Sequence, residues 1–145
     1  MDALKLLALD EEDLAIVSAH VQDAVGKVSG LAYDWRGGQF SLALNRFVWE
    51  KAEDGKGFER RRALLNFKRV QAVRSVGFDR KAGEAVLDLL AIEFERKGEG
   101  PDGTVTLVLA GAGAIALDVE CIEVLLADTG GAWETSFRPR HLAGE

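Results

Sequence analysis

The amino-acid sequence predicts an α+β protein: a curved, mostly antiparallel sheet, or a partly open barrel, of about seven or eight strands with a helix near each end. Two observations predict this class. Over most of the chain, apolar residues alternate with polar ones at the period of two that a half-buried strand shows. The polar segments between these stretches are short and contain glycine, which favours antiparallel neighbours over parallel crossovers.

The chain opens with a short strand and a helix. Leu4, Leu6 and Ala8 alternate with their neighbours, as in a strand. Asp10 is the predicted N-cap of the helix, and Asp13 occupies the third position of a capping-box-like arrangement. The helix should present an apolar stripe and continue to about Gly26, because residues spaced by three and four positions are apolar: Leu14, Val17, Val21, Ala24 and Val25.

A hairpin is predicted over residues 28–49, with its turn at residues 36–39. The apolar residues of its second strand share one face until Phe47 and Trp49, which fall on the opposite face. Either a bulge near residues 45–46 restores the inward direction, or both faces of the strand are covered beyond this point. We favour the bulge, which would re-aim the side chains of residues 45 and 46.

The middle of the chain continues the same pattern. Residues 50–59 are polar and contain glycine, which predicts a surface loop. Three further alternating stretches predict strands at residues 62–68, 70–78 and 90–95.

Residues 104–130 form the predicted closing unit. Two alternating stretches, 104–109 and 114–119, predict a pair of antiparallel strands whose turn uses Gly111 and Gly113. From Asp118 onward the apolar spacing lengthens to that of a helix, at Ile122, Leu125 and Leu126. We therefore expect a helix with Asp118 as its N-cap and Gly130 just past its end, packed over the hairpin.

A curved sheet closed by a C-terminal helix is similar in element order to the pleckstrin-homology-like architecture. A flatter α+β sheet with both helices on one face is the alternative.

The composition predicts one globular domain, residues 1–145, whose last several residues are flexible. One cysteine excludes an internal disulfide framework, and no apolar run approaches the ~20 residues of a membrane helix. We expect a cytoplasmic protein without a membrane association. Residues 46–81 hold eleven Lys or Arg and five Asp or Glu, a net charge of +6, whereas the rest of the chain carries −12. A pI near 5.0 argues against a nucleic-acid-binding domain.

Four segments resemble those of an uncharacterised bacterial single-domain family, a domain of unknown function: residues 44–47 (Leu-Asn-Arg-Phe), 60–62 (Arg-Arg-Arg), 69–75 and 117–123. The resemblance extends from Leu4 to about Arg140. It implies a bacterial protein with a single domain, and it implies no reaction, ligand or catalytic residue.

Residues capable of catalysis or metal binding are few. Cys121 stands between Glu120 and Glu123, which oppose a thiolate, so we interpret it as a buried structural residue. His20 and His141 share no metal-ligand spacing with each other or with Cys121. The carboxylates at positions 118, 120 and 123 fit helix capping better than acid–base chemistry. We therefore predict no metal, no cofactor and no catalytic site.

Arg74 is in phase with the apolar residues of its strand, which directs it inward, where an unpaired guanidinium is costly. We expect a carboxylate partner for it, with Asp118 and Glu120 the first candidates. The competing interpretation is a bulge near Arg74 that turns the side chain to solvent.

The function predicted is that of a small non-enzymatic binding module. Its surface would be a basic patch on the central strands that engages an anionic ligand, an acidic protein partner or a second copy of the chain. The alternative is a small-ligand-binding protein or enzyme, with a pocket near Arg74 between the sheet and the C-terminal helix. A third interpretation of the +6 region is simple charge complementarity within the molecule. The predicted binding residues are Arg46, Arg60, Arg61, Arg62, Lys68, Arg69 and Arg74.

Overall fold

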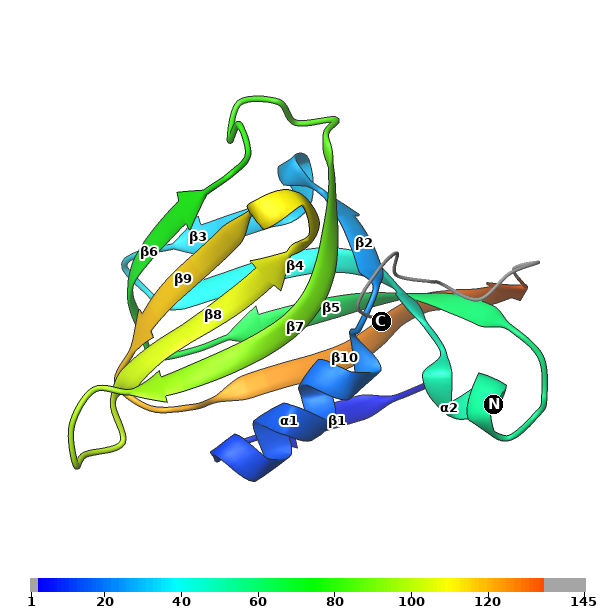
Figure 1. The fold of residues 1–145 in the computed structure, drawn as a ribbon, viewed down its shortest axis with the longest axis horizontal. Helices are drawn as coiled ribbons and strands as arrows, with labels where there is room; N and C mark the ends of the chain where they lie inside the picture. Colours follow the sequence, from blue (N-terminus) through cyan, green and yellow to red (C-terminus); the bar gives the residue numbers. More distant parts are fainter. Residues whose placement is uncertain (1–2, 135–145) are drawn as a thin grey trace.

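One antiparallel sheet of ten strands curls around a single core in the computed structural model, which describes residues 3–134, the last four by backbone alone (Figure 1). The strands are β1 (Lys5–Ala8), β2 (Ala24–Lys27), β3 (Leu31–Asp34), β4 (Gln39–Phe47), β5 (Glu59–Phe67), β6 (Val70–Val76), β7 (Val86–Arg96), β8 (Gly103–Leu109), β9 (Ala114–Val119) and β10 (Val124–Glu134). The helices are α1 (Glu11–His20) and α2 (Trp49–Glu53), with 3₁₀ turns η1 (Val28–Gly30) and η2 (Ala110–Ala112).

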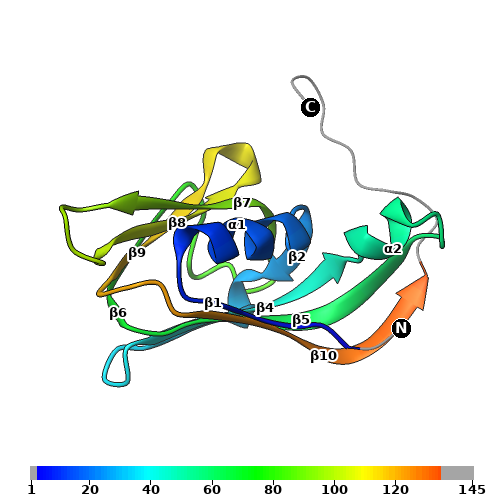
Figure 2. The ribbon, with the colours of Figure 1, turned by 90° about the horizontal axis from the view of Figure 1, so that it is seen from below.

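The strands follow the order β1-β10-β5-β4-β2-β7-β8-β9-β6, and β3 pairs with β4 beside this path. All the pairings are antiparallel. Strands β1, β10, β5, β4 and β3 form one layer, and β7, β8, β9 and β6 form the other (Figure 2). The two layers enclose the core, to which both contribute: Leu42, Leu65 and Phe67 from the first, and Leu89, Leu107, Ile115 and Leu117 from the second.

The prediction of an α+β class with a curved antiparallel sheet is confirmed, but the number of strands is ten, and the predicted C-terminal helix is wrong. Where that helix was expected, β9 continues to Val119 and β10 begins at Val124. Val119, Ile122, Val124 and Leu126 are all buried, at spacings close to the period of a strand. The apolar residues of this segment also recur at intervals of three and four positions, so their spacing alone does not distinguish a strand from a helix. Pairing decides it, because β10 lies between β1 and β5 and hydrogen-bonds to both.

The N-terminal elements confirm the predicted strand and helix start, but the helix is shorter than expected. The Asp10 carboxylate accepts a hydrogen bond of 2.8 Å from the backbone N–H of Asp13. The helix ends at His20, and residues 24 and 25 belong to β2. Asp23 adopts a left-handed backbone conformation with φ of 63°, which ends the turn, and its N–H donates to the carbonyl of Leu89. His20 Nδ1 lies 2.9 Å from the Ile16 carbonyl oxygen, within its own helix.

The bulge predicted in β4 is absent, and the second interpretation, with both faces covered, is correct. The pairing of β4 with β5 is regular from Phe40 opposite Phe67 to Phe47 opposite Arg60. Arg46 therefore shares the inner face with Leu42 and Leu44, and Phe47 is buried on the other face under Trp49 and Phe58. The expected loop after this strand contains the short helix α2.

The sheet does not close on itself. Within residues 3–134, strand β3 pairs only with β4 and β6 pairs only with β9, so the sheet is open between β3 and β6. Helix α1 packs against β1 and β7 (Figure 2). No helix in residues 3–134 is long and apolar enough to span a bilayer. The predicted flexible end and His141 lie outside the described residues.

Candidate functional site

The seven predicted binding residues do not form one surface. Strand β5 places successive side chains on opposite faces, so Arg61 points into the molecule, whereas Arg60 and Arg62 point to the outer face. Arg46, opposite Arg61 on β4, also points inward. Lys68 and Arg69 lie between β5 and β6, and Arg74 lies on β6. The basic residues of the sequence therefore occupy three separate environments.

Arg46 belongs to a buried ionic network. Its side chain is 0% exposed and donates to both carboxylate oxygens of Asp128, from Nε at 2.8 Å and from Nη2 at 3.0 Å. It also donates to both oxygens of Glu50, at 3.2 and 3.1 Å. Asp128, likewise 0% exposed, accepts a further hydrogen bond of 2.8 Å from the backbone N–H of Leu4. These contacts join β4, β10, α2 and the segment before β1.

Arg61 extends this network. Its Nε lies 3.0 Å from Glu59, its Nη1 lies 3.9 Å from Asp128, and Glu59 also accepts from Lys51 at 2.9 Å. Three cations and three carboxylates are thus grouped beneath α2, so the network carries no net charge. Because Arg46 and Arg61 are buried and paired with carboxylates, their charges are satisfied inside the fold, and removing one partner would leave a buried charge uncompensated.

The pKa values in the network reflect this pairing. Burial alone would raise the pKa of Asp128, but the hydrogen bonds from Arg46 and from the Leu4 N–H outweigh it and hold this pKa below its ordinary value. The pKa of Glu59 is lowered in the same way, since the hydrogen bonds from Lys51 and Arg61 outweigh its burial. Burial alone would lower the pKa of Arg46, but its hydrogen bonds to Asp128 and Glu50 outweigh this effect, and the pKa is raised.

Acid should therefore destabilise the protein through these carboxylates. A carboxyl group with a lowered pKa in the folded state contributes stability that is fully present above about pH 4, its unfolded value. That contribution is lost as the pH falls through the folded-state pKa. We expect the free energy of unfolding, measured by urea titration, to fall steeply below about pH 4, and less steeply in D128N. The control is E84Q, which removes an exposed pair with Lys27. A slope in D128N equal to that of the wild type would contradict this assignment.

The remaining basic residues on the β5–β6 side have carboxylate partners. Lys68 and Arg69 lie 4.0 and 3.5 Å from Glu123. Arg74 forms a two-pronged ion pair with Asp118, which confirms the predicted partner. Of the two interpretations of its direction, the bulge that turns the side chain to solvent is correct, because the pairing of β6 shifts between Val70 and Ala72 and the Arg74 side chain is 57% exposed. Asp118 accepts from Arg74 and from Thr104, so it does not cap a helix.

Arg74 borders a polar hollow of about 660 Å³ between β6, β9 and the β7–β8 turn. The alternative pocket between the sheet and a C-terminal helix does not exist here, since the elements around Arg74 are strands and a turn. Basic and acidic side chains line the hollow in equal number: Arg74, Arg96 and Lys97 against Glu95, Asp102 and Asp118. The formal charge of its lining is therefore zero.

Arg60 and Arg62 both lie on the outer face but differ in exposure. Arg60 is half-buried against the Phe47 ring and donates to the carbonyl oxygens of Asn45 and Asp23, at 3.2 and 3.4 Å. Burial lowers the pKa of Arg60, although Asp88 and Asp23 oppose this effect. Arg62 is exposed, and no described side chain forms an ion pair with it.

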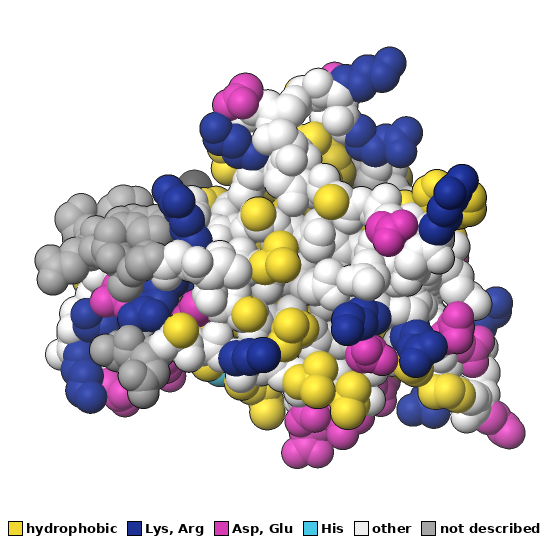
Figure 3. All heavy atoms as spheres, turned by 180° about the vertical axis from the view of Figure 1, so that it is seen from behind, with side chains coloured by type: hydrophobic (Ala, Val, Ile, Leu, Met, Phe, Trp, Pro, Cys, Tyr) yellow, Lys and Arg dark blue, Asp and Glu magenta, His cyan; other side chains and the backbone are white. Residues whose placement is uncertain are grey.

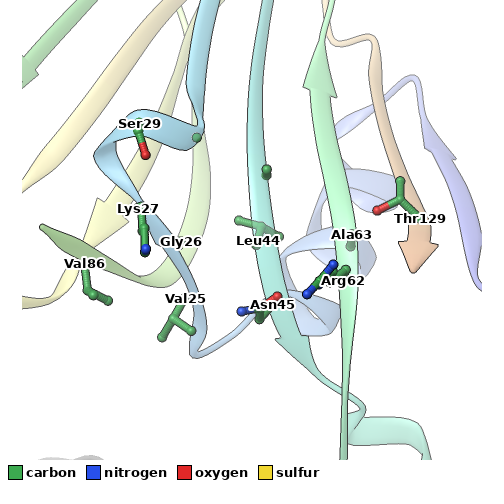
Figure 4. A pocket seen from close by; sticks show the side chains of 12 residues that line it. Val25, Gly26, Lys27, Ser29, Leu44, Asn45, Arg62, Ala63, Val86 and Thr129 are labelled. Carbon is green, nitrogen blue, oxygen red and sulfur yellow. The ribbon is translucent and has the colours of Figure 1, made fainter. Parts of the chain in front are cut away.

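Arg62 stands at the edge of a groove of about 430 Å³, which we call the outer groove (Figure 4). The groove forms where β2 and η1 cross β4, with β5 and β10 on its other side. Its lining includes apolar Val25, Ala43 and Val86, the glycines at positions 26 and 30, and the polar residues Lys27, Ser29, Asn45, Arg62 and Thr129.

The floor of the outer groove depends on a close approach between two segments. A Cβ atom at Gly26 would lie 2.6 Å from the carbonyl oxygen of Ala43, and one at Gly30 would lie 3.3 Å from it. The absence of side chains at these positions lets β2 and η1 pass directly over β4. The stem of Arg62 similarly passes close to Gly130, where an added Cβ would lie 3.0 Å from it.

The outer groove continues into an uncovered apolar face of the sheet. Leu7 and Leu64, 57% and 36% exposed, lie on this face with the half-buried Leu125 and Ala127. No described helix covers this face. Figure 3 shows hydrophobic groups over its middle, with most of the charged groups toward its margin. The combination of an open apolar surface with one exposed arginine is typical of a surface that binds another molecule.

Sequence reasoning included Arg62 but not the groove beside it. The available signal was the recurrence of small residues, Gly26, Gly30 and Ala43, at segments that the sequence could not place side by side. Cys121, predicted to be buried, is only half-buried. In the described part of the chain, no three His, Cys, Asp or Glu side chains are grouped as a metal site requires.

The fold and the outer groove define a small α+β protein with a half-open antiparallel sheet and an exposed groove on its convex side. The family model described as "Protein of unknown function (DUF2948)" matches residues 4–141, and the chain belongs to this family. No curated protein and no solved structure matches the chain.

Proposed function

We propose that the protein is a binding module whose outer groove and adjoining sheet face engage an acidic segment of a partner protein. The observation that carries this proposal is the exposed guanidinium of Arg62, the member of the seven predicted binding residues that is both exposed and without an ion-pair partner among the described side chains. No described carboxylate pairs with it, whereas the charges of Arg46, Arg61, Lys68, Arg69 and Arg74 are matched by described carboxylates.

A protein segment fits this surface better than an isolated anion does. The groove has a volume of about 430 Å³, its lining includes Gly26, Gly30 and Ala43, and it leads onto the exposed Leu64 and Leu7. Apolar side chains of a partner would cover this area, and an acidic side chain would pair with Arg62. Lys27 adds a second cation at the margin, although it pairs with the exposed Glu84 at 2.8 Å.

The proposal predicts the outcome of a peptide selection. Peptides selected on the protein from a random displayed library should combine Asp or Glu with large apolar residues. Their affinity should fall about tenfold or more in R62E, which corresponds to about 1.4 kcal/mol for one ion pair and its reversal. Affinity should also fall as salt rises, because an exposed pair is screened.

The matched control is R36E, an equal change of charge at the β3–β4 turn, where Arg36 stacks on Trp35 outside the groove. It should leave peptide affinity unchanged. Selected peptides without acidic residues, or equal losses in R62E and R36E, would refute the proposal. If the partner is a second copy of the chain, sedimentation will show a dimer that R62E dissociates and R36E does not.

A further inference from the structure

A further concave site, separate from the outer groove and from the polar hollow beside Arg74, lies at the opening between β3 and β6. This slot has a volume of about 260 Å³. Because β3 and β6 do not pair with each other, the slot leads from the surface toward side chains of the core. Phe40, Ile115 and Val28, all nearly inaccessible, form its inner end, and Leu31, Val73 and Phe78, half-buried, form its walls.

The mouth of the slot differs chemically from its interior. Arg80, Tyr33 and Ser75 line it together with the apolar residues. Arg80 is exposed, and no described carboxylate forms an ion pair with it. The neighbouring Asp79 accepts a hydrogen bond from the backbone N–H of Lys81 at 2.9 Å, within the turn. The slot thus combines an apolar interior with a single positive charge at its entrance.

We propose that this slot binds a small amphipathic carboxylate, with its apolar part between Leu31, Val73 and Phe78 and its carboxylate on Arg80. Burial of the apolar part supplies most of the affinity, and the arginine fixes its orientation. The site lies apart from the outer groove and does not depend on the function proposed there.

The dimensions of the slot favour a small molecule over a strand added between β3 and β6. A hydrogen bond of 2.9 Å from the Val70 N–H to the Gly38 carbonyl joins the start of β6 to the β3–β4 turn and closes one end of the opening. A strand added between β3 and β6 needs a continuous open edge for its hydrogen bonds. The closed end of the opening would block it. The volume is also below the ~300 Å³ at which pockets for drug-sized ligands begin, so a short acyl chain or a single ring fits.

The test uses octanoate and 1-octanol, which share a chain length and differ in charge. Each is titrated into ¹⁵N-labelled full-length protein while amide shifts are recorded. We expect octanoate to shift the amides of β3 and of residues 73–80, and to leave those of Gly26 and Arg62 unchanged. Octanol should shift the same amides but bind about tenfold more weakly, the value of one ion pair.

Two substitutions then separate the apolar and the ionic contributions. S75F, which fills the slot, should abolish the shifts caused by both probes. R80Q should weaken octanoate about tenfold and leave octanol unchanged, whereas K81Q, a neutralisation in the same turn, should change neither. R80Q lies in an exposed turn, so it keeps the test informative if S75F fails to fold.

Any one of four results would overturn the proposal. The first two are the absence of shifts at the slot with both probes and shifts confined to the outer groove. The other two are equal binding of octanoate by R80Q and the wild type, and undiminished binding by a folded S75F.

Discussion

Replacing Arg46 with methionine is expected to destabilise the protein by about 3–5 kcal/mol, the usual cost of removing one member of a buried ion pair. The substitution preserves most of the volume of the side chain but leaves Asp128, whose side chain is 0% exposed, with its main partner gone. Glu50 loses the same partner but is partly exposed and can be hydrated. The loss therefore arises chiefly from an uncompensated charge at Asp128.

Urea unfolding of the wild type and R46M at pH 7 measures this difference. The control is R74M, which breaks an ion pair of similar geometry on the surface and should cost far less, because water replaces the lost contact. The double variant R46M/D128L should recover part of the stability lost in R46M, since it removes the stranded carboxylate. If R46M and R74M are equally stable, the network does not have the structural role assigned to it.

The second large effect is expected from the smallest change in the outer groove, Gly26 to alanine. The new methyl carbon would lie 2.6 Å from the backbone oxygen of Ala43, well inside contact distance. Neither atom is at the end of a flexible side chain, so β2 and β4 must separate. We expect a destabilisation of about 1–3 kcal/mol, the usual cost of forcing extra volume into a packed site.

Thermal and urea unfolding of G26A will measure this cost. The control is G98A, where an added Cβ meets no atom within 4 Å, so stability should be nearly unchanged. Because Gly26 also lines the outer groove, G26A should bind the selected acidic peptides more weakly even where it is fully folded. An unchanged melting temperature in G26A would show that the two strands separate easily and that the glycine is not required.

Local patterns predicted the parts of this fold that local interactions determine. The Asp10 cap, the start of α1 and the turn before β4 were all predicted, because the interactions that form them lie within a few residues. The partnership of Arg74 with Asp118 was also predicted, since few carboxylates occupy the strands near it. Its direction was left open between the core and solvent, because a shift of one residue in pairing exchanges the faces of a strand, and the sequence does not show where such a shift occurs.

Where a sequence pattern was compatible with two different structures, only the tertiary contacts decided between them. The apolar spacing between Asp118 and Gly130 satisfies a helix and nearly satisfies a strand, and the free edges of β1 and β5 decide in favour of the strand. The regular phase of Arg46 with Leu42 and Leu44 was visible in the sequence, but a buried arginine is plausible only once Asp128 and Glu50 are placed beside it. The basic patch was predicted from the positive charges alone, because the carboxylates that pair with them are distant in the sequence.

The position of β10 has a consequence for the order of assembly. This strand is the last of the described elements, yet it separates β1, the first, from β5, and β1 has no other strand partner within residues 3–134. During synthesis, β1 and the edge of β5 must wait for residues 124–134 to emerge, and Arg46 must wait for Asp128. Contacts that span nearly the whole chain are slow to form, so until then the nascent protein exposes two unpaired strand edges, and Arg46 has Glu50 as a partner but lacks Asp128. Unpaired strand edges of this kind make an incompletely folded chain prone to aggregation.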